Sequence, residues 1–586
     1  MKNQEKIEKM RHTLSHILAA AVKELYPTTT FGVGPTVENG FYYDIDFNGT
    51  KISDSDLPKI EKKMRGIVQM NCEMKRREVS REEAIEWAKK NGQKYKVELI
   101  EDLPEGETIS FYDIVKGEKV IFEDLCRGPH LENTKEVGAF KLIRVAGAYW
   151  RGDEKREMLT RIYGVAFETE EELEAFLKQQ EEAKARDHRK LGKELDLFCF
   201  SDLVGAGLPM FTPRGTILRN MLGAFANSYR ERCGYQKVCI PHIASIDLYK
   251  TSGHFEKFPE MLRFVSSESG DELALKPVNC PHHSQIFASV PRSYKELPVK
   301  FLETTMVYRD ERKGELGGLS RVRAITQDDS HVFCTEEQVG DIFGELIESA
   351  KDLYRRVDMK LKLRLSFRDE GDGYIGTSEM WEKAQNSIKE MAEKFNMDYF
   401  IGIGEAAMYG PKMDFMAVDA LGREWQLATV QLDYAMPTRF GLEYTAEDGT
   451  KKTPIMIHCA LIGSIERFMS IFIEHTAGWF PFWAAPEQVR ILTVNDQVGE
   501  YVDEVKRVLD GIELNDPVQD NYLRYSIDNS DDSLGKKIKR ATTLKIPAIL
   551  IVGPKDMEEK KVSVRLRDRE EKVELKDLAK YLEELK

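Results

Sequence analysis

The clearest hydrophobic pattern in the chain lies near its start, between residues 5 and 26. Apolar residues recur there at helical spacing and fall on one face. They are Ile7, Met10, Leu14, Ile17, Leu18, Ala21, Val22 and Leu25. We predict a helix that ends before Pro27, because proline cannot continue one. His12 and His16 are four residues apart on the face opposite to this stripe, so we expect them outside the core.

The rest of the N-terminal region mixes short strands with helices, which predicts one α+β domain over residues 1–167. Strands are expected at 41–47 and 141–150, and helices at 55–69 and 81–90. Residues 168–194 are intensely charged and have few apolar positions. A helix of that composition has little to bury, so we predict a solvated linker helix between two domains.

Two further domains are predicted from a change of texture along the chain. Residues 195–485 are rich in strands, glycine and aromatic residues and form the largest domain. From residue 486 to residue 586 strands and helices alternate, which is typical of a compact α/β domain. The strands are expected at 489–494, 547–553 and 562–567, and the helices near 499–510, 533–544 and 576–585.

Composition changes this picture little, but it excludes some classes of protein. A length of 586 residues suits three or four domains of ~100–200 residues each. No apolar run reaches the ~18 residues of a membrane span, and the first residues contain no apolar signal core. Eight cysteines are too few for a disulfide framework, so we expect a cytoplasmic protein with free thiols. A net charge of −14 argues against indiscriminate coating of nucleic acid.

Two segments carry candidate chemistry, although the chain has no Walker loop and neither the HIGH nor the KMSKS motif. Residues 307–333 (VYRDERKGELGGLSRVRAITQDDSHVF) predict a strand, a polar loop and a second strand. Residues 457–475 (IHCALIGSIERFMSIFIEH) predict a short strand that runs into a helix, with Arg467 at the junction. Each arginine taken alone is most simply explained by a surface ion pair.

The combination of YRDER, RVRAITQDD and GSIERF is more specific, and it resembles motifs 2 and 3 of the class II aminoacyl-tRNA synthetases. A long helix at 215–233 followed by the strand YQKVCIP looks like motif 1 of the same class. Motif 1 builds the dimer interface in that class, so the resemblance implies a homodimer. It also implies an antiparallel sheet flanked by helices as the fold of the central domain.

The same resemblance implies an ATP site without a phosphate loop. It assigns the α-phosphate to Arg309, the adenine end of ATP to Glu311 and the γ-phosphate to Arg467. Arg321 is a further phosphate candidate, Lys412 is expected to reach the substrate side, and Mg²⁺ would accompany ATP. Arginine suits this task because its fork bonds two phosphate oxygens and stays charged while a carboxylate attacks the α-phosphate.

Three residues bear on the choice of amino acid: Cys280 in KPVNCPHH, His331 in TQDDSHVF and His458 in MIHCALIGS. Their spacing is far too long for a local zinc motif, and buried thiols and satisfied histidines are common. Together with GEAAMYGPKMDF (404–415) and WQLATVQLDY (425–434), however, these segments resemble the threonyl-tRNA synthetase family over essentially the whole chain. The resemblance implies that the three residues bind one Zn²⁺ per subunit.

A zinc ion with three protein ligands keeps an open position, which threonine can fill with its amino group and hydroxyl. Valine lacks the hydroxyl, so such a site can reject it by ~10⁴–10⁵, whereas an apolar pocket separates isosteres by only ~10². The resemblance assigns the amino acid to Asp329, Tyr409 and Gln431, with Gln327 and Gln426 close by. His282 and His283 are rival ligands beside Cys280, and Val278 stands where relatives often carry methionine.

Serine also offers an amino group and a hydroxyl, so a second, hydrolytic site is expected. The segments HTLSH and DLCRGPH contain two pairs of metal-binding residues, which on chemistry alone suggest zinc. They also resemble the bacterial-type threonyl editing domain, which implies metal-free hydrolysis of Ser-tRNA by histidines, a lysine and positioned water. Both interpretations stay open. The candidate residues are His12, His16, Lys96, Asp124, Cys126 and His130.

The last ~100 residues, a usual domain size, resemble the anticodon-binding domain of this synthetase subclass. Arg565 and Asp556 occupy positions that contact anticodon bases in the family, although relatives often carry glutamate at the second position. The basic segment 535–545 fits either a phosphate contact or a solvated helix face. Many bacterial relatives begin with a ubiquitin-like domain before the editing helix, so we expect no tRNA contact of that origin here.

Three hypotheses follow from these residues. The first is a threonine–tRNA ligase that binds tRNA(Thr), ATP and L-threonine and edits Ser-tRNA(Thr). The second is a non-catalytic tRNA- or mRNA-binding paralogue, which would be expected to lose Arg309, Arg467 or a zinc ligand. The third is a class II synthetase for another amino acid, such as proline or serine, and the conjunction of Cys280, His331 and His458 argues against it.

Overall fold

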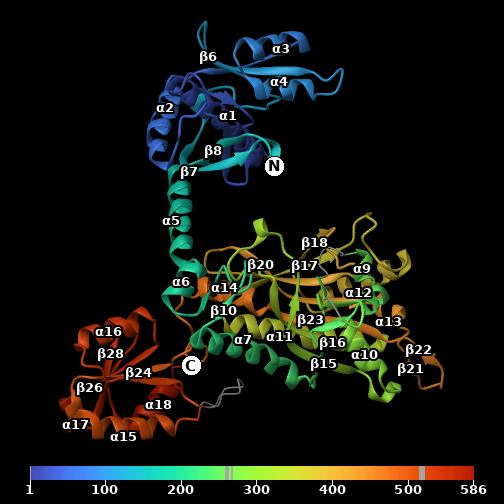
Figure 1. The fold of residues 1–586 in the computed structure, drawn as a ribbon, viewed down its shortest axis with the longest axis vertical. Coiled ribbons are helices and arrows are strands. Elements are labelled where there is room, and N and C mark those ends of the chain that lie inside the picture. The colour runs from blue at the N-terminus through green and yellow to red at the C-terminus, as the bar shows by residue number, and fades with distance from the viewer. Residues whose placement is uncertain (1, 258–262, 266–267, 514–521, 586) are drawn as a thin grey trace. The chain divides into compact units, whose positions relative to one another are not determined.

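The computed structural model describes residues 2–257, 263–265, 268–513 and 522–585, which form two compact units over residues 1–181 and 182–586 (Figure 1). Each unit is described by itself. Among the described residues, no helix combines the length and the apolar character needed to cross a membrane.

Two antiparallel sheets and four helices build the first unit. The first sheet has the strand order β1-β3-β8-β7, and β2 pairs with the first residues of β3. Its strands are β1 (Thr30–Phe31), β2 (Thr36–Val37), β3 (Gly40–Asp46), β7 (Ala139–Tyr149) and β8 (Met158–Phe167). The second sheet contains β4 (Glu73–Val79), β5 (Ile109–Lys116) and β6 (Lys119–Leu125). The helices are α1 (Lys2–Leu25), α2 (Leu57–Gln69), α3 (Arg81–Lys90) and α4 (Lys94–Glu101).

The predicted first helix is confirmed as α1, but only His12 is partly exposed, and His16 is not outside the core. From Leu14 to Val22 every residue of α1 is buried, and His16 is only 2% exposed. The reason is that α1 contacts the first sheet on one side and the segment 126–131 on the other. The apolar stripe of α1 predicts only its contact with the sheet, because the side of α1 that contacts the segment 126–131 is lined by polar residues.

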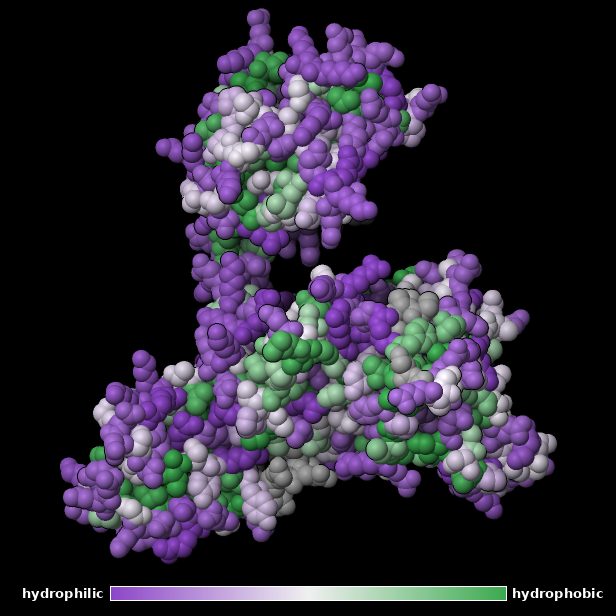
Figure 2. Space-filling view, in the orientation of Figure 1, coloured by the Kyte–Doolittle hydropathy of each residue, from purple (hydrophilic) through white to green (hydrophobic). Residues whose placement is uncertain are grey.

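The charged linker is two helices rather than one. The first, α5 (Glu170–Arg186), buries only Leu173, and Figure 2 shows hydrophilic side chains along it, as predicted. The second, α6 (His188–Glu194), begins after Asp187, whose non-helical backbone breaks the helix and whose carboxylate accepts from the Arg189 N–H. The prediction of a solvated helix is wrong for α6, which buries one side of its first turns in the second unit.

An eight-stranded sheet forms the centre of the second unit, in the order β11-β15-β16-β23-β20-β19-β17-β18. All pairs are antiparallel except β11 with β15 and β17 with β18. Its strands are β11 (Gln236–Lys237), β15 (Val299–Tyr308), β16 (Ala324–Cys334), β17 (Lys360–Phe367), β18 (Tyr399–Ile403), β19 (Lys412–Val418), β20 (Glu424–Asp433) and β23 (Ile455–Ser464). The expected antiparallel sheet flanked by helices is therefore confirmed.

The helices that share the main core with this sheet are α6, α7 (Pro213–Arg232), α11 (Val339–Arg356), α12 (Ser378–Lys394) and α14 (Ile465–His475). Figure 1 shows α7 and α11 running along the sheet. Smaller elements surround its other parts. They are β9 (Phe198–Cys199), β10 (Met210–Phe211), β12 (Ile243–Ser245), α8 (Ile246–Ser252), α9 (His254–Lys257), β13 (Arg263–Val265), β14 (Leu273–Leu275), α10 (Cys280–Ala288), α13 (Ala435–Arg439), β21 (Tyr444–Thr445) and β22 (Lys451–Lys452).

The C-terminal part of the second unit is a five-stranded sheet in the order β25-β24-β26-β27-β28. The strands are β24 (Val489–Thr493), β25 (Tyr525–Asp528), β26 (Ala548–Val552), β27 (Lys561–Arg565) and β28 (Glu570–Glu574). The helices are α15 (Gly499–Asp510), α16 (Leu534–Thr543), α17 (Pro554–Glu559) and α18 (Leu578–Glu583). All six predicted elements are present, whereas the sequence did not predict β25, β28 and α17, which are short and partly polar.

Candidate functional site

The three predicted metal ligands meet in the second unit. His331 on β16 stands directly opposite His458 on the neighbouring strand β23, and Cys280 opens α10. Their donor atoms lie within 4.8 Å of one another and all three side chains are buried. Strand pairing therefore explains how residues that are distant in sequence can form one site.

Each histidine of this cluster is held from behind by another side chain. His458 Nε2 lies 2.8 Å from Asp433 Oδ2, so it donates there and leaves Nδ1 free. His331 Nδ1 lies 2.8 Å from His283 Nδ1, and His283 Nε2 lies 3.6 Å from Glu303 Oε2. His283, the predicted rival ligand, thus supports His331 from behind. Such contacts orient metal-binding imidazoles.

The donor set itself fits a metal ion. Burial lowers the pKa of His331 well below its ordinary value, which keeps its imidazole available as a neutral ligand. Burial also raises the pKa of the Cys280 thiol, and a cation would counter this effect by favouring the thiolate. One thiolate and two imidazoles are the ligand types that zinc takes at sites with an open position. His282 is buried, but both its ring nitrogens lack partners and it is outside the cluster.

The residues predicted to bind the amino-acid substrate lie around the same cluster. The Tyr409 ring stacks on His458 with centroids 4.5 Å apart, and its hydroxyl donates to Gln431 Oε1 at 2.5 Å. Gln431 stands opposite His458 on β20. Asp329 lies two residues before His331 on β16, and its Oδ1 is 3.8 Å from His331 Nε2.

The other residues predicted to lie near the substrate belong to β16, β19 and β20. Lys412 pairs with Gln431 across β19 and β20, and its Nζ is 3.3 Å from Asp414 Oδ2. Gln426 is already satisfied, because it donates to Asp414 and accepts from Arg364. Gln327 pairs with Ser464 at the end of β23. Val278 packs in the same cluster of apolar residues as Cys280 and Tyr409.

The two arginines assigned to ATP come from different elements. Arg309 directly follows β15, its Nε donates to Pro277 O at 3.3 Å, and burial lowers its pKa. Arg467 is in the first turn of α14, where its backbone N–H donates to Ser464 Oγ. Its Nε is buried without a partner, and burial followed by repulsion from Arg321 lowers its pKa. An anion placed between Arg467 and Arg321 would relieve both effects.

Glu311 and Arg321 form an ion pair in the loop between β15 and β16, with Arg321 Nε donating to Glu311 Oε2 at 2.8 Å. A histidine that the sequence analysis missed, His254, lies beside the site. Its Nδ1 is 2.9 Å from Ser252 Oγ, and burial, followed by the charges of Arg309 and His458, lowers its pKa to about 3. The segment TSGHF offers no spacing that would have revealed this position.

The predicted editing residues converge in the first unit. The donor atoms of His12, His16, Cys126 and His130 lie within 4.8 Å of one another, so the group could hold a metal ion. Cys126 Sγ is 3.3 Å from both His12 Nε2 and His130 Nε2. Behind them Lys96 Nζ is 2.6 Å from Asp124 Oδ1, and His16 Nε2 is 4.0 Å from Asp124 Oδ2.

Hydrogen bonds set the tautomers of two of these histidines. His12 Nδ1 donates to the Pro129 carbonyl at 3.1 Å. His130 Nδ1 is 3.3 Å from Thr13 Oγ1, whose own proton goes to the Lys9 carbonyl. Both Nε2 lone pairs therefore face Cys126.

Burial lowers the pKa of the three histidines of this cluster and raises the pKa of Cys126 to about 12. The centre thus combines neutral imidazoles with a protonated thiol. Tyr43 is a further member that sequence reasoning missed: it donates to Asp124 and accepts from Lys96 at 3.0 Å. Tyr43 belongs to β3, and the spacing of polar residues in that strand does not indicate a site.

The predicted anticodon residues lie toward opposite ends of β27 and differ in their surroundings, because Arg565 pairs with Ile549 at the start of β26 whereas Asp556 lies beyond the end of β26. Arg565 ends β27 with a partly exposed side chain. Asp556 is buried, and it accepts from the Gly553 N–H and from Ser563 Oγ at the start of α17. On α16, Lys537 is buried on the Thr493 carbonyl and Arg540 pairs with Asp528, so part of the basic segment is used internally.

Three family models match the chain. They are the class II core domain of tRNA synthetases for G, H, P, S and T over residues 263–476, the anticodon binding domain over 488–585, and the second additional domain of threonyl and alanyl tRNA synthetases over 109–163. A threonine–tRNA ligase of Gloeobacter violaceus is 50% identical over 578 residues, which cover 97% of this chain and 90% of the relative. The chain belongs to the threonine–tRNA ligase family.

A second ligase of this family, from Thermosynechococcus vestitus, is 48% identical over 96% of this chain and 92% of its own length. Among solved structures, the RNA binding domain of threonyl-tRNA synthetase from Cryptosporidium parvum has a TM-score of 0.63 and 34% identity, covering 68% of this chain and 98% of that chain. Prolyl-tRNA synthetase of Giardia lamblia, at 17% identity and a TM-score of 0.54 over 68% of this chain and 76% of that one, shows the fold alone. These matches confirm the resemblance read from the motifs.

Proposed function

We propose that this chain activates L-threonine with Mg²⁺-bound ATP, transfers it to tRNA(Thr), and hydrolyses Ser-tRNA(Thr). The observation that carries the proposal is the buried Cys280–His331–His458 cluster, with Tyr409 stacked on one of its members, in a chain of the threonine–tRNA ligase family. Arg309 and Arg467 are both present, which argues against a non-catalytic paralogue.

In the activation step the chain's own groups bind and orient rather than react. Arg309 would hold the α-phosphate, where negative charge accumulates as the threonine carboxylate attacks. Arg467 would bond the γ-phosphate with its unpartnered Nε–H, and Arg321 would exchange Glu311 for a phosphate oxygen. Glu311 would then be free to accept from the adenine amino group. Lys412 would reach the substrate from the neighbouring strand.

We propose that Cys280, His331 and His458 hold one Zn²⁺ per subunit. When bound, zinc supplies a Lewis-acidic open position for the amino group and the hydroxyl of threonine. Asp329 would accept from the amino group, while Tyr409 and Gln431 close the pocket around the side chain. Gln327 and Gln426 support the strands on either side.

For the editing site we propose hydrolysis without a metal. His12 and His130 present lone pairs to the same small region, where they can orient a water molecule and take its proton. Lys96 and Asp124 form a buried charge pair that can hold the seryl ester. The rival is a zinc ion on His12, Cys126 and His130, whose donor atoms also lie close enough together to hold one.

The other proposed features concern organisation and partners. We assign residues 1–167 to editing, 168–194 to the linker, 195–485 to the class II core and 486–586 to anticodon binding, with Arg565 and Asp556 as candidate base contacts. We propose a homodimer through α7, as motif 1 implies. All eight cysteines are unpaired, which agrees with a cytoplasmic location.

The experiment that tests this function is pyrophosphate–ATP exchange with threonine, serine and valine side by side. We expect strong stimulation by threonine, weaker stimulation by serine and almost none by valine. No stimulation by threonine would refute the proposed function, and stimulation by serine alone would favour the other class II assignment. Metal analysis should find about one zinc per chain, whereas two would support a metal in the editing site.

A further inference from the structure

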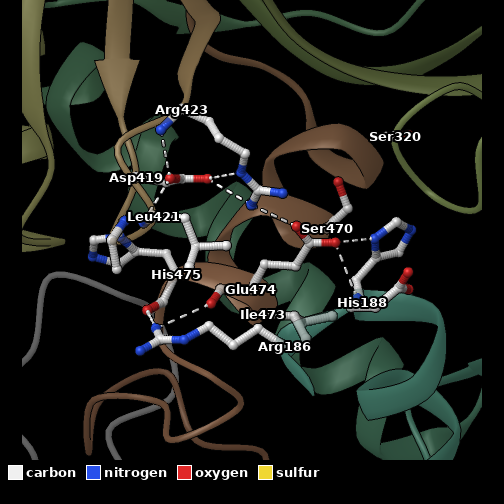
Figure 3. A network of polar contacts seen from close by, with 12 residues as sticks. Arg186, His188, Ser320, Asp419, Leu421, Arg423, Ser470, Ile473, Glu474 and His475 are labelled. Atoms are coloured by element: carbon white, nitrogen blue, oxygen red, sulfur yellow. Dashed lines mark hydrogen bonds and ion pairs between the residues drawn. The ribbon is translucent and has the colours of Figure 1, made fainter. Parts of the chain in front are cut away.

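His188, in the first turn of α6, is a buried histidine outside both candidate sites. Its Nδ1 lies 2.6 Å from Glu474 Oε1, and its backbone N–H donates to the same oxygen at 3.0 Å. On the other side of the ring, the backbone N–H of Leu319 donates to His188 Nε2 at 3.1 Å. Figure 3 shows the imidazole directed at the Glu474 carboxylate. One side chain of the linker thus touches the end of α14 and the loop between β15 and β16.

These two contacts define the hydrogen positions of the ring. A carboxylate opposite Nδ1 requires a proton on that nitrogen, and an amide N–H opposite Nε2 requires a lone pair there. Both ring nitrogens are therefore engaged. Asp187, His188 and Glu474 bring three donor atoms within 4.8 Å of one another, but this engagement and the capping role of Asp187 explain the group without a metal.

The loop fits closely against the ring. Gly318 has a φ of +59°, and a Cβ added to it would lie 2.3 Å from His188 Nε2. Any other residue at this position would push the loop away from the imidazole. The loop also contains Arg321 and Glu311, which form the ion pair at the proposed adenine and phosphate end of ATP.

A second line of contacts leads from His188 to Arg467. Glu474 Oε2 is 2.6 Å from Arg423 Nη2, and Arg423 Nε donates to Asp419 Oδ2 at 2.7 Å. Asp419 Oδ2 also accepts from Trp425 Nε1 at 2.9 Å. Figure 3 shows Glu474 between His188 and Arg423. The Arg467 guanidinium lies 5.8 Å from the Trp425 ring centroid, so the line ends under the γ-phosphate arginine.

We propose that His188 is a positioning residue for ATP, an inference that rests on the proposed function of the loop and of Arg467. Through Leu319 it holds the loop that carries Arg321 and Glu311. Through Glu474 it fixes the strand that carries Trp425. The linker helix α6 thereby sets both ends of the ATP site, although it contributes no atom to it.

Two substitutions separate the two contacts. In His188→Asn the amide nitrogen can replace Nδ1 toward Glu474, but nothing accepts from the Leu319 N–H. In His188→Gln the longer side chain can place its carbonyl oxygen near the Nε2 position and accept from Leu319. We expect His188→Asn to raise the KM for ATP by about tenfold, since a buried amide loses its acceptor, with the KM for threonine unchanged. His188→Gln should restore most of the ATP affinity, and Lys190→Asn, on the exposed side of α6, should behave as the parent.

Calorimetry that measures the binding of a non-hydrolysable ATP analogue in the absence of any amino acid makes the test independent of which amino acid the enzyme activates. Failure of the parent to exchange with threonine would count against the proposed function, while the ATP affinities of the variants would still decide the role of His188. Gly318→Ala provides a second route to the same displacement should His188→Asn not fold, and we expect it to weaken ATP similarly. Unchanged ATP affinity in His188→Asn or in Gly318→Ala would overturn the proposal.

Discussion

His458 Nε2 lies 2.8 Å from Asp433 Oδ2, and this contact fixes which nitrogen of the imidazole faces the metal cluster. The carboxylate is itself held, because Asp433 Oδ1 accepts from the backbone N–H groups of Ala435 and Met436 at the start of α13. The orientation of His458 therefore depends on a helix start as well as on its own strand. A residue outside the predicted ligand set thus controls the ligand geometry.

Asp433→Asn should weaken zinc binding by about 10–100-fold, which is the usual cost of removing such a supporting carboxylate. The amide can present a donor to His458 Nε2 and so favour the wrong tautomer. Competition with a chromophoric chelator measures the affinity directly. Asp448→Asn, in an exposed loop, serves as the matched control. Equal zinc affinities for the two variants would contradict the role assigned to Asp433.

Zinc removal should lower threonine activation and reduce discrimination against valine. Without the metal, only an apolar pocket separates the two amino acids, so we expect selectivity of about 10² instead of about 10⁴–10⁵. Exchange assays on chelator-treated and zinc-restored protein provide the comparison. Selectivity that survives metal removal would mean that Tyr409, Gln431 and Asp329 reject valine by themselves.

Several helices, and the strands on either side of YRDER, could be predicted from the sequence because their patterns are local, whereas the antiparallel central sheet was implied by the family resemblance. The apolar stripe of α1, and the strand–loop–strand pattern around YRDER, need no knowledge of distant residues. The group of Cys280, His331 and His458 could not be predicted from local patterns. Its three members come together because β16 pairs with β23 and α10 begins beside them, and only the family resemblance indicated that pairing.

The wrong predictions concern helices that are buried on two sides, of which the sequence pattern reveals only the apolar one. His16 is buried because the segment 126–131 covers the polar side of α1, and α6 is buried because His188 and Leu191 have partners distant in sequence. The supporting residues Asp433 and Tyr43 were missed for the same reason, and His283 was predicted as a rival ligand instead of a support for His331. Their roles depend on tertiary neighbours, which leave no spacing in the chain.

Arg467→Lys should lower kcat/KM for ATP by about 100-fold, the scale for losing one group that stabilises developing charge. Lysine keeps the charge but loses the planar fork and its place near the Trp425 ring. Exchange kinetics at varied ATP measure the effect. Arg355→Lys, at the exposed end of α11, should be neutral. A change of less than threefold in Arg467→Lys would remove the γ-phosphate assignment.

The pH dependence of stability should reveal the buried histidines of the first unit. Burial lowers the pKa values of His12, His16 and His130 in the folded state, whereas an unfolded histidine has a value of about 6.5. Below that value the unfolded chain binds more protons than the folded one, so the free energy of unfolding decreases as the pH falls. The stabilising contribution of the neutral histidines is fully present only above that value. Urea unfolding followed by a probe in residues 1–181 measures this slope. His130→Gln should flatten it, and an unchanged slope would mean that His130 is solvated.

His12→Ala should let Ser-tRNA accumulate while threonine charging persists. His12 is the best of the editing histidines to test, because it is only partly buried, whereas removal of the fully buried His16 would leave a cavity. The loss of Ser-tRNA hydrolysis should be specific, because His12 Nε2 faces Cys126 and none of the residues proposed to bind ATP belongs to the first unit. Deacylation of Ser-tRNA and charging of threonine are measured on the same preparation, with Lys6→Ala on the exposed N-terminal turn of α1 as control. If charging and deacylation fall together, the histidine is structural. Zinc-dependent deacylation by the parent would replace the metal-free mechanism with the zinc alternative.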